Sequence, residues 1–391
     1  MVYSSRWRAG IGELSRCFDE LHLKVQGNQF LQHGTHEPLF DAPLVLIACS
    51  GGRDSLALVA LASKVCASRG LRCAVVIVDH NLQSSSHIVA NNAALECEKL
   101  GISKDSIYIE SITVKDCGTG VEASARDARY SAIISRAKSL NAAVVLLAHT
   151  AHDQAETVIM GLRDSAGLEA IAGMNAFIVR DGVKFARPLL RITRDDTTGI
   201  CEDCSIKWWD DPTNGDLVPS DQELNKKYPL RSRIRHTLMP YISRFFNADM
   251  VNLLTRGAEI AQDDLDYINS QVDDVASKTM SVNFVNVDST SMNSMSVDST
   301  SMNFADNCSS KNVEVILDVK KLKNCHISIR RRVIARALNT MNLRFSSTHV
   351  SAIDDLINNW HGQKAISLPK HVQACRTSVK NTPVIRLCNY S

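Results

Sequence analysis

One stretch of the chain, residues 44–61, constrains the fold more than any other. It begins with the apolar run Leu-Val-Leu-Ile-Ala, which has the length of a buried strand, and ends with apolar residues from Leu56 to Leu61, which are typical of a buried helix. Two adjacent glycines, Gly51 and Gly52, lie in the turn between them. The first N–H groups of a helix have no partners within the helix, and the helix dipole favours negative charge there. The stretch therefore predicts a strand–turn–helix unit that binds phosphate.

The residues of this turn indicate which kind of phosphate loop it is. A Walker loop requires Gly-Lys followed by Ser or Thr, and the chain contains no Gly-Lys pair. Asp54 is an unusual neighbour for phosphates unless a metal ion bridges them, so it predicts Mg²⁺. The pattern Ser-Gly-Gly-x-Asp-Ser resembles the pyrophosphate-binding loop of the ATP pyrophosphatase superfamily. This resemblance implies that ATP binds to Ser50, Gly51, Gly52, Arg53, Asp54 and Ser55.

Apolar runs of strand length recur after this loop and alternate with helical patterns. The predicted strands are Cys73–Val78, Ser106–Ile112, Ala143–Ala148 and Val183–Ala186. Such runs predict an α/β fold with a doubly wound, mostly parallel sheet covered on both faces. Ligands bind at the carboxyl ends of the strands in these sheets. We therefore expect the phosphate loop, Asp79, His80 and His149 to lie along one edge of the sheet.

The length of 391 residues predicts two or three domains. Val-Asp-Ser-Thr-Ser-Met-Asn occurs at 287–293 and again at 297–303, in a region poor in large apolar residues, which predicts a flexible linker. The predicted segments are an N-terminal helix and loop (1–40), an ATP-binding catalytic domain (41–192), a helical subdomain (193–270), the linker (271–312) and a small C-terminal α+β domain (313–391).

A second motif, His149 to Thr157, follows the predicted strand that ends at Ala148. Asp153 and Glu156 are three residues apart, so on a helix they share a face. Together with Asp54 they are candidates for a carboxylate cluster that binds Mg²⁺. The alternative is that acidic residues stand at a helix N-terminus because the dipole favours them there.

A third motif, Glu122 to Tyr130, contains Arg126 and Arg129 at helical spacing. One interpretation is an ion-paired surface face, which contributes little to stability. The other is that the arginines face phosphate or a developing negative charge.

Together these three motifs resemble those of the tRNA(Ile)-lysidine synthase family. Asp211-Pro-Thr-Asn and Arg231-x-Arg233-x-Arg235-His236 extend the resemblance, which covers 42–245 well and Leu317–Leu387 more faintly. It implies a nucleotide-binding fold like that of the adenine nucleotide alpha hydrolases. It also implies ligation of free L-lysine, with ATP, to the wobble cytidine of a CAU-anticodon tRNA(Ile).

The resemblance further implies that particular residues act in catalysis. These are Asp54, Arg126, His149, Asp153 and Glu156, with Asp54 and Asp153 as metal ligands and Asp79 and His80 beside the nucleotide. The sequence departs from the family pattern at His152, where an acid is expected before Asp153.

Clusters of basic residues predict where RNA binds. The net charge is only +2, so a basic surface that binds RNA must come from local clusters of basic residues rather than from the overall charge. The candidates for tRNA contact are Arg231, Arg233, Arg235, Arg330, Arg331 and Arg332, although each cluster is also consistent with an ordinary solvated face.

Cysteine usage and hydropathy indicate the compartment. The twelve cysteines lie mostly inside apolar runs, as in a reducing compartment, and no apolar run has membrane-spanning length. We expect a cytoplasmic protein without a membrane segment, and we leave open whether it is a monomer or a homodimer. Two rival functions are a tRNA sulfurtransferase, for which only Cys201 and Cys204 are suitably spaced, and a tRNA-binding module without catalysis.

Overall fold

The computed structural model describes residues 4–32, 36–79, 86–112, 121–165, 167–215, 218–219, 222–285, 293–295 and 312–389. The chain divides into two compact units, Met1–Gln262 (unit 1) and Asp263–Ser391 (unit 2). No helix in the described part of the chain is both long and apolar enough to span a bilayer.

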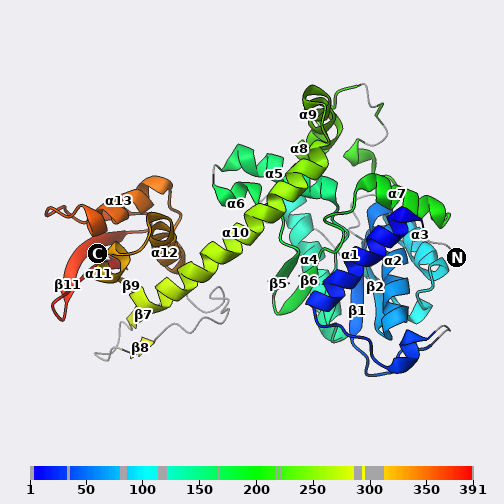
Figure 1. Cartoon of the computed structure of the whole chain (residues 1–391), viewed down its shortest axis with the longest axis horizontal. Coiled ribbons are helices and arrows are strands. Elements are labelled where there is room, and N and C mark those ends of the chain that lie inside the picture. Colours follow the sequence, from blue (N-terminus) through cyan, green and yellow to red (C-terminus); the bar gives the residue numbers. More distant parts are fainter. Residues whose placement is uncertain are drawn as a thin grey trace. The chain divides into compact units, whose positions relative to one another are not determined.

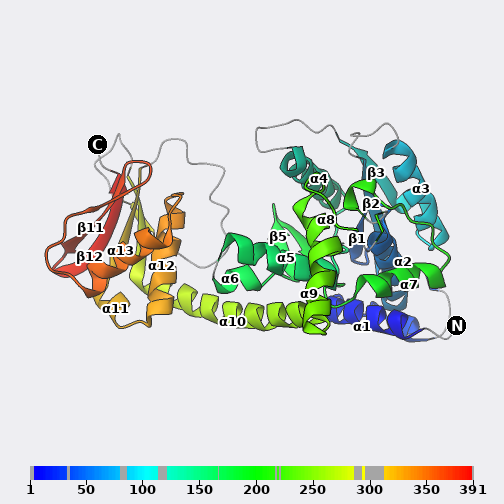
Figure 2. The same ribbon diagram turned by 90° about the horizontal axis from the view of Figure 1, so that it is seen from above.

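Unit 1 is built on a sheet in which every strand but one is parallel (Figures 1 and 2). The strand order is β3-β2-β1-β4-β6-β5, so the chain reverses its direction of winding between β1 and β4. The predicted doubly wound α/β fold is therefore confirmed. The strands are β1 (Leu44–Cys49), β2 (Arg72–Asp79), β3 (Ile107–Ser111), β4 (Val144–Leu146), β5 (Phe177–Arg180) and β6 (Val183–Ala186).

The antiparallel edge strand β5 was not predicted. It pairs with β6 through a tight turn in which Asp181 and Gly182 both have positive φ. Asp-Gly is a strong hairpin signal when it lies between two short strands, so the signal was present in the sequence.

Apolar helices cover both faces of this sheet. One core contains residues of α1 (Ser5–Glu20), α2 (Arg53–Arg69), α3 (Ser86–Lys99) and α7 (Arg194–Asp203), and the other contains residues of α4 (Val121–Ser139). The remaining helices of the unit are α5 (Ala151–Asp164), α6 (Leu168–Ile171), α8 (Leu230–Arg233), a π-helical turn η4 (Ile234–Leu238) and α9 (Met239–Phe246). Short 3-10 turns lie at Asn28–Leu31, Lys104–Ser106 and Pro212–Asn214, and α10 (Met250–Thr279) begins here and ends in unit 2.

Unit 2 is a small α+β structure around an antiparallel sheet. Its strand order is β10-β11-β12-β9-β7-β8, and the helices α11, α12 and α13 contribute to its core. The elements are β7 (Met280–Val285), β8 (Asn293–Met295), β9 (Asn312–Asp318), α11 (Val319–Lys323), α12 (Ile327–Thr340), α13 (Ser347–Asn358), β10 (Ile366–Leu368), β11 (Val372–Val379) and β12 (Thr382–Asn389).

The predicted linker over 271–312 is too long at its N-terminal end. Residues 271–285 belong to α10 and β7, and the side chains of Val272, Ala276 and Val282 are buried in the core of unit 2. Spacing by four residues puts Val272 and Ala276 on one helix face, and burial of that face outweighs the polar composition around it. Of the repeated heptapeptide, only Asn293 lies among the described residues.

The insertion between β7 and β9 should be removable. Val285 pairs with Asn312, so the segment 286–311 closes a hairpin whose ends already lie together. Replacing 286–311 with Asn-Gly also removes the short edge strand β8, which pairs with β7. The melting temperature should nevertheless stay nearly unchanged, because a two-residue turn suits a hairpin and the lower entropic cost of closing a shorter loop offsets the lost edge pairing.

Thermal unfolding of the shortened full chain checks this expectation. Deletion of 282–307 is the control, because it removes the buried Val282 from β7 and should lower the melting temperature. An equal loss in both variants would contradict the assignment of 286–311 as dispensable.

Candidate nucleotide-binding site

The turn between β1 and α2 is held in shape by the hydroxyl of Ser55. Its Oγ donates to the carbonyl oxygen of Gly52 over 2.8 Å and accepts a hydrogen bond from the N–H of Ser50 over 3.2 Å. Gly51 has a φ of +79°, and a Cβ there would lie 3.0 Å from the Cβ of Ala93 in α3. Left-handed geometry and close packing together explain why the turn needs glycine at this position.

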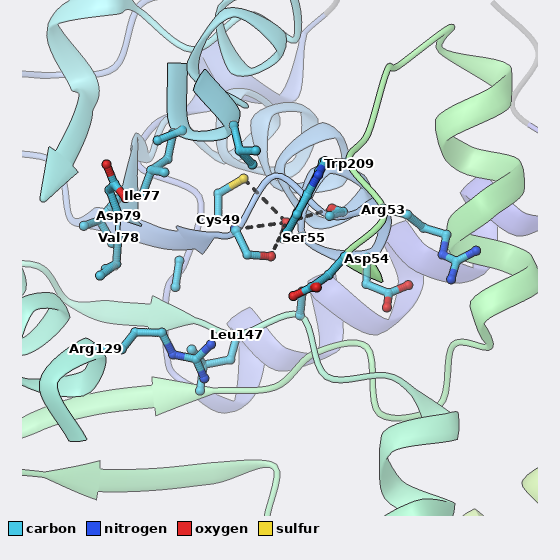
Figure 3. A pocket seen from close by; sticks show the side chains of 18 of the residues that line it. Cys49, Arg53, Asp54, Ser55, Ile77, Val78, Asp79, Arg129, Leu147 and Trp209 are labelled. Carbon is cyan, nitrogen blue, oxygen red and sulfur yellow. Dashed lines mark hydrogen bonds between the residues drawn. The ribbon is translucent and has the colours of Figure 1, made fainter. Parts of the chain in front are cut away.

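A cavity of about 440 Å³ lies at the carboxyl ends of β1, β2 and β4, beside this turn (Figure 3). This is the place where open α/β sheets bind ligands, at the point where the winding reverses. The predicted residues that line it are Ser50, Gly52, Arg53, Asp54, Ser55, Asp79 and His149. His80 lies outside the described residues.

Other residues of the cavity wall were not assigned to it from the sequence. Arg194 lies in the first turn of α7, and the indole of Trp209 stands over the loop, where the backbone N–H of Trp209 donates to the carbonyl of Gly51 over 3.0 Å. Asp211 and Asn214 also line the cavity, which gives the Asp-Pro-Thr-Asn motif a place at the site. The side chain of Arg53 points away from the turn, and its Nη1 donates to Thr198 in α7 over 3.4 Å.

Asp54 connects the turn to α7. Its Oδ1 accepts a hydrogen bond from the Thr197 hydroxyl over 2.5 Å, and its Oδ2 lies 3.4 Å from Nη2 of Arg194. No cluster of three or more His, Cys, Asp or Glu suited to a metal occurs among the described residues. Mg²⁺ commonly uses one or two carboxylates together with substrate phosphates, so the carboxylate of Asp54 would offer such an ion one ligand, in place of its contact with Arg194.

Asp153 caps the helix that begins after His149. Its Oδ2 accepts hydrogen bonds from the backbone N–H and the hydroxyl of Thr150, over 2.9 and 3.0 Å, and its Oδ1 lies 3.4 Å from Nη2 of Arg235. Burial raises the pKa of this carboxyl, but the opposing effects of His149 and of nearby arginines such as Arg235 outweigh burial, and the pKa falls to about 2. Asp153 therefore agrees with the alternative that an acidic residue stands at a helix N-terminus because the helix dipole favours it there. Both of its carboxylate oxygens already contact other groups, Thr150 and Arg235.

Glu156 is fully buried and bound by two arginines from another segment. Nε of Arg231 donates to its Oε2 over 2.9 Å, and Nε and Nη2 of Arg235 donate to Oε1 and Oε2 over 2.5 and 2.9 Å. Burial is the largest influence on Glu156 and raises its pKa, against the opposing effect of Arg235. Two of the three arginines predicted to contact tRNA here are therefore ion-paired inside unit 1. Arg233 has no ion pair with any described residue.

His149 lines the cavity with a buried Nδ1 that has no hydrogen-bond partner among the described residues. Burial is the main cause that lowers the pKa of its imidazole to about 3; Asp153 opposes this shift and the nearby Arg187 adds to it. His149 is therefore neutral at pH 7.

This neutral histidine predicts loss of stability in acid. Its pKa is near 6.5 in the unfolded chain and about 3 in the folded one, so below pH 6.5 the unfolded state binds more protons. The free energy of unfolding should fall by about 1.4 kcal/mol per pH unit as the pH drops from 6 towards 4. Urea unfolding of the wild type and of His149→Gln at several pH values measures the slope. The variant should lack this contribution, and identical slopes would contradict it.

A group of arginines surrounds Tyr130 at the other side of the cavity. The guanidinium carbons of Arg126, Arg129 and Arg180 lie 5.4, 5.9 and 4.7 Å from the centroid of its ring. Arg129 lines the cavity, and burial lowers the pKa of its guanidinium. Arg126 is exposed and does not line the cavity. The structure therefore favours Arg129 over Arg126 as the phosphate-facing arginine of this motif.

The cysteines at 201 and 204 do not form a reactive pair. Cys201 is buried in the core, where burial raises the pKa of its thiol to about 12, whereas Cys204 is exposed. A thiol with that pKa is protonated and unreactive at pH 7. This pair gives the sulfurtransferase alternative no support.

The arginine cluster in unit 2 serves partly to hold α12 against α13. Arg330 is 7% exposed and its Nε donates to Asp354 over 2.5 Å. Nε of Arg331 donates to the same carboxylate over 3.1 Å, although almost half of its side chain is exposed, and Nη1 of Arg332 donates to Ser328 over 3.0 Å. The predicted contact of Arg330 with tRNA is therefore contradicted, because the residue is buried and paired.

Comparisons with known proteins match both units. A PP-loop domain model matches residues 20–242, and a TilS substrate binding domain model matches 317–379. A tRNA(Ile)-lysidine synthase of Bifidobacterium animalis subsp. lactis is 43% identical over 99% of this chain and 96% of that protein. Another from Bifidobacterium longum is 44% identical over 99% and 98%, and one from Streptomyces coelicolor is 33% identical over 86% and 83%. With a PP-loop site of this geometry and relatives that match nearly end to end, the chain belongs to the tRNA(Ile)-lysidine synthase family.

Proposed function

We propose that this protein joins L-lysine to C2 of the wobble cytidine of CAU-anticodon tRNA(Ile), in two steps driven by ATP. In the first step the cytidine C2 oxygen attacks the α-phosphate of ATP and pyrophosphate leaves. In the second the lysine amine attacks C2 and AMP leaves. The observation that carries the proposal is the cavity at the winding reversal, which adjoins a glycine turn, a helix N-terminus and the cationic side chains of Arg129 and Arg194.

The turn and the helix N-terminus account for the binding of the triphosphate. The first N–H groups of α2 have no acceptor within the helix and can therefore donate to an anion, and the dipole of α2 adds attraction. Arg129 and Arg194 bring positive charge to the cavity wall, where charge develops as pyrophosphate departs. We assign Mg²⁺ to Asp54, and when bound the ion would act as a Lewis acid on the phosphate oxygens.

The acids of α5 differ in what they offer the lysine amine. A carboxyl with a pKa of about 2 is a poor proton acceptor at pH 7, so we assign Asp153 to orienting the amine by charge. Glu156 is occupied by Arg231 and Arg235, and we assign it to holding η4 against α5. Most of the acceleration then comes from positioning the reactants.

Mass spectrometry of tRNA nucleosides tests the proposal. Unmodified tRNA(Ile) with a CAU anticodon is incubated with ATP and one amino acid at a time, and only lysine should add mass to the wobble cytidine. A methionine tRNA with the same anticodon is the control and should stay unmodified. A sulfur-sized mass gain, or no change with any amino acid, would contradict lysine ligation.

A further inference from the structure

Helix α9 has an outer face made of aromatic side chains. Its inner face is apolar in the usual way: Met239 is buried, and Ile242 packs with it in a small core shared with α5. Tyr241, Phe245 and Phe246 are instead 57%, 69% and 61% exposed. We call these three residues the aromatic patch.

The rings of the patch are arranged against one another rather than scattered. Those of Tyr241 and Phe245 stack with centroids 6.1 Å apart, and those of Phe245 and Phe246 meet edge to face at 5.1 Å. Single exposed apolar side chains are ordinary, but a contiguous exposed group of large ones marks a binding surface. Phenyl and phenol rings are also the side chains on which unpaired nucleic-acid bases stack.

The stretch of chain that carries the patch is basic, and its nearest acid in the sequence is Asp249, three residues after Phe246. Between Asn225 and Ala248 the sequence contains no Asp or Glu. Arg231 and Arg235 are neutralised by Glu156, but the other cations have no ion pair with any described residue. Those remaining cations are Lys226, Lys227, Arg233 and Arg244. A polyanion is the complementary partner, whereas a second copy of this surface would set like charges against each other.

The patch is rigidly connected to the nucleotide site. Helix α9 continues directly from η4, and Arg235 of η4 binds Glu156 of α5. Helix α5 begins two residues after His149, which lines the cavity. Figure 2 shows α8 and α9 following one another in one continuous helical segment.

We propose that the aromatic patch stacks unpaired bases of the tRNA anticodon loop and so positions the wobble nucleotide for entry into the cavity. The inference rests on the proposed function, since it takes the anticodon loop as the substrate. Stacking is tolerant of base identity, so the patch supplies affinity and orientation, and the recognition of sequence lies elsewhere.

Binding of an anticodon stem-loop RNA to the full chain tests the proposal. The double variant Phe245→Ala/Phe246→Ala should bind the stem-loop about tenfold or more weakly, because each lost stacking contact weakens binding substantially. The slope of log affinity against log salt should not change, since no phosphate contact is lost. A fully paired RNA of the same length should bind the variant and the wild type equally.

Matched variants separate stacking from charge and from folding. Phe40→Ala removes another exposed phenylalanine of unit 1 and should leave binding unchanged. Arg244→Gln should instead reduce the salt slope by about one. Phe245→Trp/Phe246→Trp should restore affinity, because tryptophan also stacks.

Three outcomes would overturn the inference. The double alanine variant could bind the stem-loop with wild-type affinity, or lose as much affinity for the fully paired RNA. Sedimentation could instead show that the wild type is a dimer and the double alanine variant a monomer, in which case the patch binds a second copy of the chain. The binding assay uses no lysine and no ATP. A wild type that binds the stem-loop through the patch but forms no lysidine would refute the proposed reaction alone.

Discussion

Asp54→Asn should lower the rate of ATP-dependent pyrophosphate release by at least about 100-fold, and leave the affinity for tRNA unchanged. Asparagine has the shape of aspartate and still accepts the hydrogen bond from Thr197, but it cannot neutralise a cation. If Asp54 holds Mg²⁺ at the phosphates, the loss falls on kcat of the first step. Pyrophosphate release at saturating ATP and filter binding of tRNA measure the two quantities on one preparation.

Thr197→Val is the matched control for this variant. It removes the hydrogen bond to Asp54 and keeps the carboxylate, so it should cost far less activity than Asp54→Asn if charge is what matters. Normal pyrophosphate release by Asp54→Asn would exclude Asp54 from the mechanism. Equal losses in both variants would reassign it to positioning α7 against the turn.

Glu156→Gln should lower the free energy of unfolding by about 3–5 kcal/mol, the largest stability effect that we expect in unit 1. The substitution keeps the volume of the side chain but removes the buried partner of Arg231 and leaves the largely buried Arg235 with the more distant Asp153, at 3.4 Å. Urea unfolding at pH 7 measures the change. Glu13→Gln is the control, because its partner Arg16 on α1 is half exposed and such pairs contribute about 1 kcal/mol or less.

A compensating variant separates the cost of the unpaired arginines from loss of the carboxylate itself. Glu156→Leu/Arg231→Met/Arg235→Leu replaces Glu156 and its two arginines with apolar residues, while Asp153 keeps its hydrogen bonds from Thr150. This variant should recover most of the lost stability, because the desolvation cost of these three charges is removed together with their attraction. A triple variant as unstable as Glu156→Gln would show that packing of the salt bridge, rather than its charge balance, holds η4 against α5.

Local sequence determined the central part of this protein. The continuous apolar runs of β1, β2 and β4 report burial on both faces, and the turn between β1 and α2 is held by hydrogen bonds among neighbours in sequence. Because parallel strands place their carboxyl ends at one edge, the sequence also predicted that Ser50, Asp79 and His149 line one cavity.

Pairing between distant charges was decided only by the tertiary structure. The sequence shows Glu156, Arg231 and Arg330 as charged residues of unknown partners, and helical spacing does not tell which of them is buried. The fold brings Glu156 to Arg231 across 75 positions and Arg330 to Asp354 across 24, and so turns predicted phosphate contacts into internal ion pairs. A buried charge is stable only beside a counter-charge, and the packing of distant segments determines which residue supplies it. The periodicity of one segment therefore does not predict the partner.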